Sequence, residues 1–234
     1  MLVSLIVPTL REEKNLRILI PEASEILKKY TNNSFEIVIV DDNSQDGTET
    51  LITKFQHRYP VRLIVRKKEK GLSGAVIRGF QEAKGEYFIV MDADLSHPPS
   101  LLKTIVEKIQ LDFDFILPSR YMKGGGVEKW PLPRKVISLV ATSFAHFLTK
   151  VKDPMSGYFA FKRKVIEGIQ LNPIGYKILL EILVKGKYEA DKLIEIPYMF
   201  QNRHIGQSKL NGKIYYEYIK QLVQLYSFKI KKKK

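Results

Sequence analysis

The sequence contains no cysteine among its 234 residues. A disulfide framework, a thiolate metal site and a cysteine nucleophile are therefore excluded together. Long apolar runs are also missing. The longest candidate, residues 137–148, is interrupted by Ser138, Ser143 and His146, and it falls short of the ~20 residues that cross a bilayer. The chain opens directly into the apolar run 2–7 without a basic leader, so we expect no targeting peptide and a soluble or peripheral protein.

Acidic residues are few relative to basic ones. Lys and Arg number 39 against 25 Asp and Glu, which gives a formal net charge of +14. Five of these lysines lie among the last six residues. Such a surplus favours anionic partners, namely nucleic acid, acidic lipid headgroups or phosphorylated substrates. The alternative explanation is simple solubility, or the lysine-rich composition of hot-adapted proteins.

The first half of the chain alternates short β-branched runs with amphipathic stretches. The strand pattern predicts strands over residues 2–7, 35–40, 61–65, 87–91 and 113–117. Apolar spacings of three and four predict helices over residues 12–30, 46–58, 72–84 and 98–110, with Pro98 and Pro99 in the first helical turn. This alternation is typical of βαβ units, so we expect an α/β protein with a mostly parallel central sheet flanked by helices.

After Arg120 the pattern changes. The glycine-rich segment 123–127 is expected to be a flexible loop. We then expect a helix at 131–150, a strand at 158–161, a helix at 174–185, a strand at 192–200 and a last helix at 213–228. No repeat and no long linker is visible. We expect one domain over residues 1–211, followed by an amphipathic helix with a polybasic tail over 212–234.

Polar residues gather where three of the predicted strands end. Residues 8–12, 41–44 and 92–94 follow the first, second and fourth strands. In open α/β sheets, ligands bind outside the carboxyl ends of the strands. These clusters therefore predict one ligand site at that edge of the sheet.

Asp92 and Asp94 are the strongest chemical signal. Two carboxylates one residue apart, directly after a buried strand, project to the same side and can share one hard cation such as Mg²⁺ or Mn²⁺. Ser96 and His97 belong to the same turn. The structural alternative is a turn of Asp and Ser that caps the next helix.

Two further clusters point to a nucleotide. Asp41 and Asp42 end the second strand, and two adjacent carboxylates there need hydrogen-bond donors, for which the ring N–H groups of a nucleoside are suitable. The segment GLSGA at 71–75 lacks the spacing of a dinucleotide loop, so we interpret it as close loop packing with backbone N–H groups near a phosphate.

Basic residues in the polar loops suit phosphate recognition. They are Arg120, Arg134, Arg203 and Lys209. Arginine matches phosphate geometry through two parallel hydrogen bonds. Together with the acidic strand ends, these residues indicate a site that holds both a metal ion and several phosphates.

Seven strings carry a resemblance to a known family. They are VPTLREEKN (7–15), IVIVDDNSQDGT (37–48), KGLSGAVIRGF (70–80), MDADLSHPP (91–99), SRY (119–121), DPMSGYFAF (153–161) and RHIGQSKL (203–210). The sequence resembles the polyprenyl- and dolichyl-phosphate hexosyltransferases of glycosyltransferase family 2, most closely the dolichol-phosphate mannosyltransferases. The resemblance implies a GT-A-type fold and inverting, metal-dependent transfer of a hexose, foremost mannose from GDP-mannose, to dolichyl or polyprenyl phosphate.

The resemblance also implies roles for individual residues. Residues implied in nucleotide-sugar binding are Pro8, Leu10, Glu12, Val40, Asp42, Asp92, Ala93, Asp94, Lys177, Arg203 and Lys209. Those implied in holding the acceptor phosphate are Arg120, Arg134 and Ser138, and those implied in metal binding (Mg²⁺ or Mn²⁺) are Asp92, Asp94 and Ser96. The catalytic residues would be Asp92, Asp94 and Arg120. The family pattern P-T-Y-N-E reads PTLRE here, and the missing tyrosine at Leu10 keeps UDP-glucose or another nucleotide sugar open as the donor.

The lipid acceptor implies a membrane surface as partner. Helix 131–150 is expected to lie in the interface or, equally, to face the core. The aromatic and lysine-rich segment 213–234 suits an anionic membrane surface, and we expect a peripheral protein on the cytoplasmic face. A separate membrane-anchoring subunit is the alternative means of attachment. A nucleic-acid-binding protein is the rival class, but strand-end carboxylates would repel phosphate and no nucleic-acid motif is present, so we expect no nucleic-acid partner.

Overall fold

The computed structural model describes residues 1–68, 70–128, 130–172, 174–201 and 212–232. The strands are β1 (Val3–Thr9), β2 (Phe35–Asp41), β3 (Val61–Val65), β4 (Tyr87–Val90), β5 (Phe115–Ser119), β6 (Gly126–Val127), β7 (Phe159–Lys162), β8 (Leu193–Pro197) and β9 (Met199–Phe200). The helices are α1 (Glu13–Tyr30), α2 (Thr48–Phe55), α3 (Leu72–Glu82), α4 (Leu101–Gln110), α5 (Leu132–His146), α6 (Ile178–Lys185) and α7 (Gly212–Lys232), with short 3-10 turns at Arg163–Ile166 and Ala190–Lys192.

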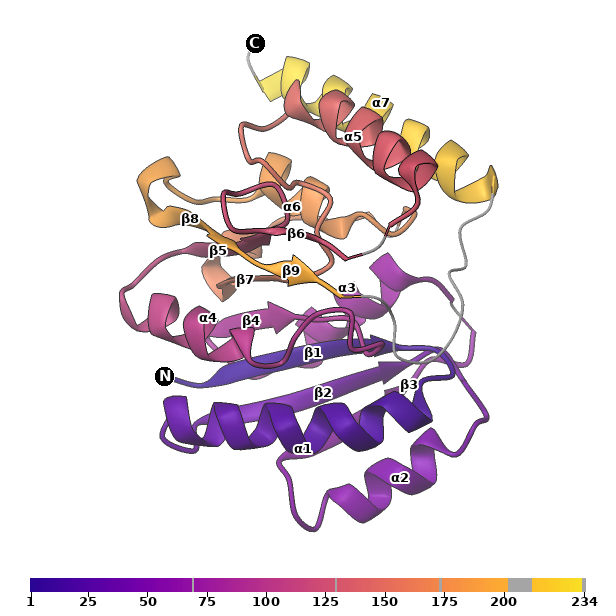
Figure 1. The fold of residues 1–234 in the computed structure, drawn as a ribbon, viewed down its shortest axis with the longest axis vertical. Coiled ribbons are helices and arrows are strands. Elements are labelled where there is room, and N and C mark those ends of the chain that lie inside the picture. The colour runs from indigo at the N-terminus through magenta and orange to yellow at the C-terminus, as the bar shows by residue number, and fades with distance from the viewer. Residues whose placement is uncertain (69, 129, 173, 202–211, 233–234) are drawn as a thin grey trace.

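The central sheet has the order β3-β2-β1-β4-β7-β5-β8, and only β7 runs antiparallel to its neighbours (Figure 1). Helices cover both faces: side chains of α1, α2 and α4 share one core cluster, and those of α3 and α6 share the other. Strand β1 is therefore buried along its whole length, which explains its mostly apolar sequence. The predicted α/β class and the mostly parallel sheet are confirmed.

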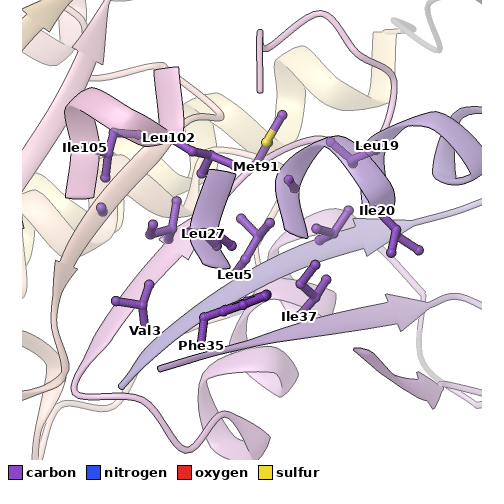
Figure 2. Close-up of a cluster of buried hydrophobic side chains, with 14 of the residues drawn as sticks. Val3, Leu5, Leu19, Ile20, Leu27, Phe35, Ile37, Met91, Leu102 and Ile105 are labelled. Atoms are coloured by element: carbon purple, nitrogen blue, oxygen red, sulfur yellow. The ribbon is translucent and has the colours of Figure 1, made fainter. Parts of the chain in front are cut away.

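The first core cluster joins β1 and β2 to the helices in front of them (Figure 2). Leu5 of β1 is fully buried, and Leu19 and Leu27 of α1 lie over the sheet at helical spacing. Alternate residues of β1 pack the other way, since Ile6 belongs to the second cluster. Because both faces are packed, the strand ends are fixed in register and the loops that follow them are held at one edge.

Several predicted elements differ from the structure. The helix expected at 174–185 begins only at Ile178, after Gly175 with its positive φ of 62°, and the helix expected at 131–150 ends at His146. The segment 123–127 is not simply a flexible loop, because Gly126 and Val127 form β6, which pairs in parallel with β9. The predicted strand 192–200 is divided after Pro197, the last residue of β8, which has no N–H to continue a ladder, and its second part, β9, leaves the main sheet. Helix α4 begins at Leu101, because Pro98 and Pro99 form turns with i to i+3 hydrogen bonds before it.

Helices α5 and α7 lie side by side at one end of the molecule (Figure 1). The Tyr218 hydroxyl donates to Ala141 O at 2.6 Å, and the Tyr226 hydroxyl donates to Phe144 O at 2.7 Å. Tyr218, Leu222 and Leu225 pack into a third apolar cluster with α5 and α6. Within the described ranges, no helix combines the length and apolar character needed to span a membrane.

Candidate active site

The carboxyl ends of β1, β2 and β4 meet at one edge of the sheet, as the sequence predicts. Pro8 lies opposite Val40 in the register, and Thr9 lies opposite Asp41. Pro8 and Val40 are both buried, and the Asp42 amide donates to Thr9 O at 3.0 Å. The three polar segments 8–12, 41–46 and 92–97 therefore line the same rim.

Asp41 and Asp46 use their carboxylates to shape the rim itself. Asp41 accepts hydrogen bonds from the amide and hydroxyl of Ser44, and the Ser44 hydroxyl oxygen accepts from the Arg11 amide at 2.7 Å. Asp46 accepts from the Glu13 amide at 3.1 Å, and although burial opposes it, hydrogen bonds from Thr48 and Glu13 lower the pKa of Asp46. These two carboxylates tie the loop after β2 to the start of α1.

Asp42 anchors the glycine-containing segment before α3. Its Oδ1 lies 2.8 Å from Nη1 of Arg66 and its Oδ2 accepts from the Gly71 amide at 2.7 Å. Burial raises the pKa of Asp42, while the Gly71 hydrogen bond and the Arg66 charge oppose that rise. A Cβ at Gly74 would lie 2.7 Å from Arg66 Nη2, so a side chain there would displace the guanidinium from its observed place. The segment 71–75 packs closely, as expected, but residues 72–75 form the first turn of α3 and the Gly71 amide donates to Asp42.

The DADLSH turn after β4 presents its two carboxylates differently. Asp94 is 4% exposed, and its Oδ1 accepts from the Ser96 amide at 3.0 Å and from the Ser96 hydroxyl at 2.5 Å. The Asp92 side chain is 30% exposed. Ser96 thus orients the Asp94 carboxylate, and its own role as a metal ligand stays a prediction. Ala93 between them is buried.

His97 supports this turn from within. Its Nδ1 accepts a hydrogen bond from the Asp92 amide at 3.1 Å, so the ring proton is on Nε2. Burial lowers the pKa of His97 to about 4, and the nearby Asp94 charge opposes that shift only in part. The ring packs against Tyr158, Tyr198 and Phe200. His97 is therefore neutral near pH 7 and is not a free proton acceptor at either ring nitrogen.

Gly157 makes room for the same turn. A Cβ at this position would lie 2.9 Å from Asp92 Oδ2 and 3.1 Å from His97 Cε1. The loop before β7 therefore packs directly against the acidic turn, which brings the segment 153–157 to the rim.

Arg120 leaves the end of β5 and pairs with Asp153 of that loop. Nε lies 2.7 Å from Oδ2 and Nη2 lies 2.7 Å from Oδ1, and the Arg120 amide also donates to Oδ2 at 3.0 Å. Both side chains are buried. Burial alone would lower the pKa of Arg120, but the hydrogen bonds and charge of Asp153 outweigh it and raise that pKa.

The other two residues implied in acceptor binding lie on α5 near Arg120. The Arg134 guanidinium carbon lies 4.1 Å from the centre of the Trp130 ring, and that of Arg120 lies 5.5 Å from the same centre. The Ser138 hydroxyl is 2.8 Å from the hydroxyl of Tyr121, the residue after Arg120. The structure thus brings Arg120, Arg134 and Ser138 into one neighbourhood.

Lys177 adds a further cation to this group. Its Nζ donates to Met155 O at 2.7 Å and lies 4.3 Å from the centre of the Tyr176 ring. Burial lowers the pKa of Lys177 to about 7; the charges of Arg120 and Arg134 contribute, and those of Asp153 and Asp92 oppose. Charges from the acidic turn and from the basic cluster therefore act on the same side chain.

Only a few side chains of the site could be ligands of a metal ion. In the part of the chain that the structure describes, no group of three or more His, Asp or Glu side chains could hold an ion. Asp92 and Asp94 supply hard oxygen donors, and Mg²⁺ and Mn²⁺ commonly complete such a pair with water and substrate phosphates. The donor set therefore fits a divalent ion that binds together with a phosphorylated substrate.

Some expected site residues are near the rim and others fall outside the described ranges. Leu10 is partly exposed beside the buried Pro8. The Glu12 carboxylate accepts from Asn15 Nδ2 at 2.6 Å. Arg203 and Lys209 lie outside the described residues.

Sequence reasoning missed Asp153, Gly157 and Trp130 as parts of the site. A signal for Asp153 was available. A buried arginine at a strand end needs a counter-ion, and Asp153 is one of only two acidic residues between positions 121 and 160.

Residues 4–169 match the sequence model of the family described as glycosyl transferase family 2. The chain belongs to this family. The resemblance inferred from the seven strings is thereby confirmed, and as a family 2 member the chain is a glycosyltransferase.

Three curated relatives of this family 2 chain carry the same name. A dolichol-phosphate mannosyltransferase of Pyrococcus furiosus is 47% identical over 96% of this chain, which spans 64% of that relative's length. Proteins of the same name from Mycosarcoma maydis and Saccharomyces cerevisiae are 41% and 42% identical, each over 97% of this chain and over 79% and 87% of their own lengths.

Solved structures of glycosyltransferases share the fold of this family 2 chain. A mannosyltransferase from Pyrobaculum calidifontis, solved with GDP-Man and Mn²⁺, gives a TM-score of 0.60 at 20% identity and covers 98% of this chain and 64% of its own. Glucosyl-3-phosphoglycerate synthase of Mycobacterium tuberculosis gives 0.65 at 16% identity, covering 97% and 80%. The predicted GT-A-type fold is confirmed.

Proposed function

We propose that this chain transfers a mannosyl group from GDP-mannose to dolichyl or polyprenyl phosphate, with inversion and with a divalent metal ion. The observation that carries the proposal is the junction of an acidic pair, Asp92 and Asp94, with a cationic group of Arg120, Arg134 and Lys177. Such a site suits two phosphorylated substrates and one hard cation. The name shared by the curated relatives supports the choice of substrates.

The donor is assigned to the rim of β1, β2 and β4. Pro8, Leu10, Glu12, Val40 and Asp42 would surround the nucleoside. Asp92, Ala93 and Asp94 would face the sugar and diphosphate, and Lys177, with Arg203 and Lys209, would neutralise the diphosphate. Asp92 and Asp94 would hold Mg²⁺ or Mn²⁺, with Ser96 supporting Asp94 or joining it as a ligand, and the ion would stabilise the leaving nucleoside diphosphate.

The acceptor phosphate is assigned to Arg120, Arg134 and Ser138. A phosphate monoester loses its second proton with a pKa of ~6, so the acceptor is already ionised near neutral pH. It needs charge compensation as it approaches an anionic donor, and two guanidinium groups supply it. Arg120 and Arg134 would therefore fix the attacking oxygen as well as bind it.

The reaction needs no strong general base. An acceptor phosphate oxygen forms a bond to the anomeric carbon while the bond from that carbon to the diphosphate oxygen breaks in line, which inverts the configuration. His97 is neutral and its Nδ1 is already occupied by the Asp92 amide. Catalysis by Asp92, Asp94 and Arg120 would thus consist of positioning and charge stabilisation.

The lipid chain of the acceptor calls for a membrane surface next to this site. Helix α5 carries Val136, Val140 and Phe144 at 52% exposure, and Phe147 directly after it is 73% exposed. Helix α7 adds exposed apolar and aromatic side chains beside the lysines of its tail. We propose that residues 212–234 and α5 attach the 1–211 catalytic part peripherally to an anionic membrane on its cytoplasmic face, alone or with a membrane subunit.

The test is transfer of radiolabelled sugar into an organic-extractable lipid, with GDP-mannose and UDP-glucose compared with and without Mn²⁺. The proposal predicts label from GDP-mannose that requires the metal. Leu10 in place of the family tyrosine keeps UDP-glucose or another nucleotide sugar open as the donor. Label from UDP-glucose alone would keep the mechanism and overturn the assigned donor.

A further inference from the structure

Trp130 is the only tryptophan of the chain, and it lies between β6 and α5. It is 9% exposed. Its ring contacts both arginines of the proposed acceptor site, Arg134 at 4.1 Å and Arg120 at 5.5 Å from ring centre to guanidinium carbon. Two side chains from different elements thus converge on one indole.

Two guanidinium groups in one neighbourhood repel each other unless their charges are compensated. The Asp153 carboxylate compensates Arg120 through two hydrogen bonds at 2.7 Å. The indole ring offers its negative π-face to cations, and tryptophan is the strongest of the aromatic side chains in this role. Trp130 therefore favours the close approach of Arg134 to a site that is already positive.

The indole is itself held in place by a neighbouring ring. Phe200 packs edge-on against Trp130 with centroids 5.4 Å apart, and its own ring lies 5.8 Å from the Arg120 guanidinium carbon. Phe200 belongs to β9, and β9 pairs with β6. Strand β6 ends three residues before Trp130 in the chain. The small second sheet thus provides a fixed support behind the indole.

We propose that Trp130 is a positioning residue that holds Arg120 and Arg134 in the arrangement that receives one acceptor phosphate. This inference rests on the proposed function, because it assumes that the two arginines bind that phosphate. Trp130 acts through the arginines. Because it orders their side chains in the free protein, acceptor binding does not have to supply the conformational entropy of ordering them. Its replacement should therefore weaken acceptor binding and leave donor binding nearly unchanged.

Two substitutions of Trp130 distinguish the effect of its aromatic face from the effect of its apolar volume. Trp130→Phe keeps an aromatic face, whereas Trp130→Leu keeps only an apolar volume. We expect Trp130→Leu to raise the KM for polyprenyl phosphate roughly 5- to 30-fold, the range for one or two lost cation–π contacts, with the donor KM within about 2-fold of wild type. Trp130→Phe should recover most of this loss. Equal losses in both variants, or no loss in either, would overturn the proposal.

A matched control is available at Tyr59, whose ring lies 5.4 Å from the Arg58 guanidinium carbon. Tyr59 packs with Phe55 against the first core cluster on another part of the fold. Tyr59→Leu removes one cation–π contact there and should leave the acceptor KM unchanged. A rise in acceptor KM equal to that of Trp130→Leu would assign the effect to general loss of stability and overturn the proposal.

A second readout does not depend on turnover. Because Trp130 is the sole tryptophan, its fluorescence reports this site alone. Arg134→Gln should shift the emission of the free protein, while Lys135→Gln, the same charge change one residue further along α5, should not. Identical emission in all three proteins would contradict the Trp130–Arg134 contact and overturn the proposal. If wild type transfers no sugar to lipid phosphate, the proposed function fails, yet this comparison still tests the Trp130–Arg134 contact.

Discussion

Arg120 and Asp153 form a buried two-pronged ion pair, with Nε–Oδ2 and Nη2–Oδ1 both at 2.7 Å. The residues are 33 positions apart and join the end of β5 to the loop before β7. The same loop contacts the acidic turn through Gly157. The pair therefore links the proposed acceptor site to the proposed metal site, and its removal should affect both stability and acceptor use.

Asp153→Asn tests this link. It leaves the buried Arg120 without its counter-ion, so we expect the free energy of unfolding to fall by about 3 kcal/mol, the usual cost of breaking a buried pair from one side. The acceptor KM should rise as well, because Arg120 loses its fixed orientation. Chemical denaturation and steady-state kinetics measure the two effects. An unchanged denaturation midpoint would contradict the buried pair.

Gly157→Ala should damage activity more than stability. The added methyl group would meet Asp92 Oδ2 at 2.9 Å and His97 Cε1 at 3.1 Å, and the partly exposed Asp92 side chain can move more easily than the buried His97 ring. We expect kcat to fall roughly tenfold or more through displacement of the carboxylate, about 1.4 kcal/mol in the barrier, with the Mn²⁺ requirement shifted to higher concentration. A metal titration of both proteins measures this. Wild-type activity at low Mn²⁺ would show that the carboxylate does not need its observed position.

Lys177 should make the rate of the reaction fall on the alkaline side of its pH profile. Its pKa is lowered to about 7 by burial and by the charge of Arg120, so the cation is lost as pH rises through 7. The value of kcat/KM for the donor should fall over that range in wild type, because this ratio reports the free enzyme. Lys177→Arg keeps the charge and should flatten this decrease. An unchanged alkaline decrease of kcat/KM in Lys177→Arg would assign that decrease to another titrating group.

The same shift in pKa has a consequence for stability. The ordinary value for the unfolded chain is 10.5, against about 7 in the folded protein. Between these values the unfolded state holds the proton and the folded state does not, so the contribution of Lys177 to stability rises with pH across that window. Lys177→Met should therefore stabilise the protein most at and below pH 7. Denaturation at several pH values checks this, and a benefit confined to pH above 10.5 would contradict the sign.

Arg134→Ala should act mainly on the acceptor. A hydrogen bond to a charged group contributes about 1.5–3 kcal/mol, so we expect the KM for polyprenyl phosphate to rise roughly 10- to 100-fold while the donor KM changes little. Lys135→Ala removes an exposed charge beside it and serves as the control. An equal rise in the donor KM of Arg134→Ala would place the residue in the donor site instead.

Much of this architecture could be predicted from the sequence, for a physical reason. The strands of a sheet covered on both faces are continuous apolar runs, so β1, β2 and β4 and their polar ends are visible in the chain. Asp92 and Asp94 were found because they follow such a run directly.

The remaining features depend on pairings that a linear pattern does not show. Strands β6 and β9 are two residues each and have no periodicity to detect. The partner of Arg120 lies 33 residues away in a loop, and the partner of Asp42 is Arg66, admitted by the absence of a side chain at Gly74. The sequence predicts that a nucleoside supplies the hydrogen-bond donors for the adjacent carboxylates of Asp41 and Asp42. In the structure, Ser44 and Gly71 of the protein itself donate to these carboxylates.

The most direct test of the account is sugar transfer from GDP-mannose with Mn²⁺ to polyprenyl phosphate and, in parallel, to the unphosphorylated polyprenol. Wild type and Asp94→Ala should be compared at matched concentrations. The account predicts labelled lipid from wild type with the phosphorylated acceptor alone, and none from Asp94→Ala. Equal label on the unphosphorylated alcohol, or near-normal turnover by Asp94→Ala, would contradict it.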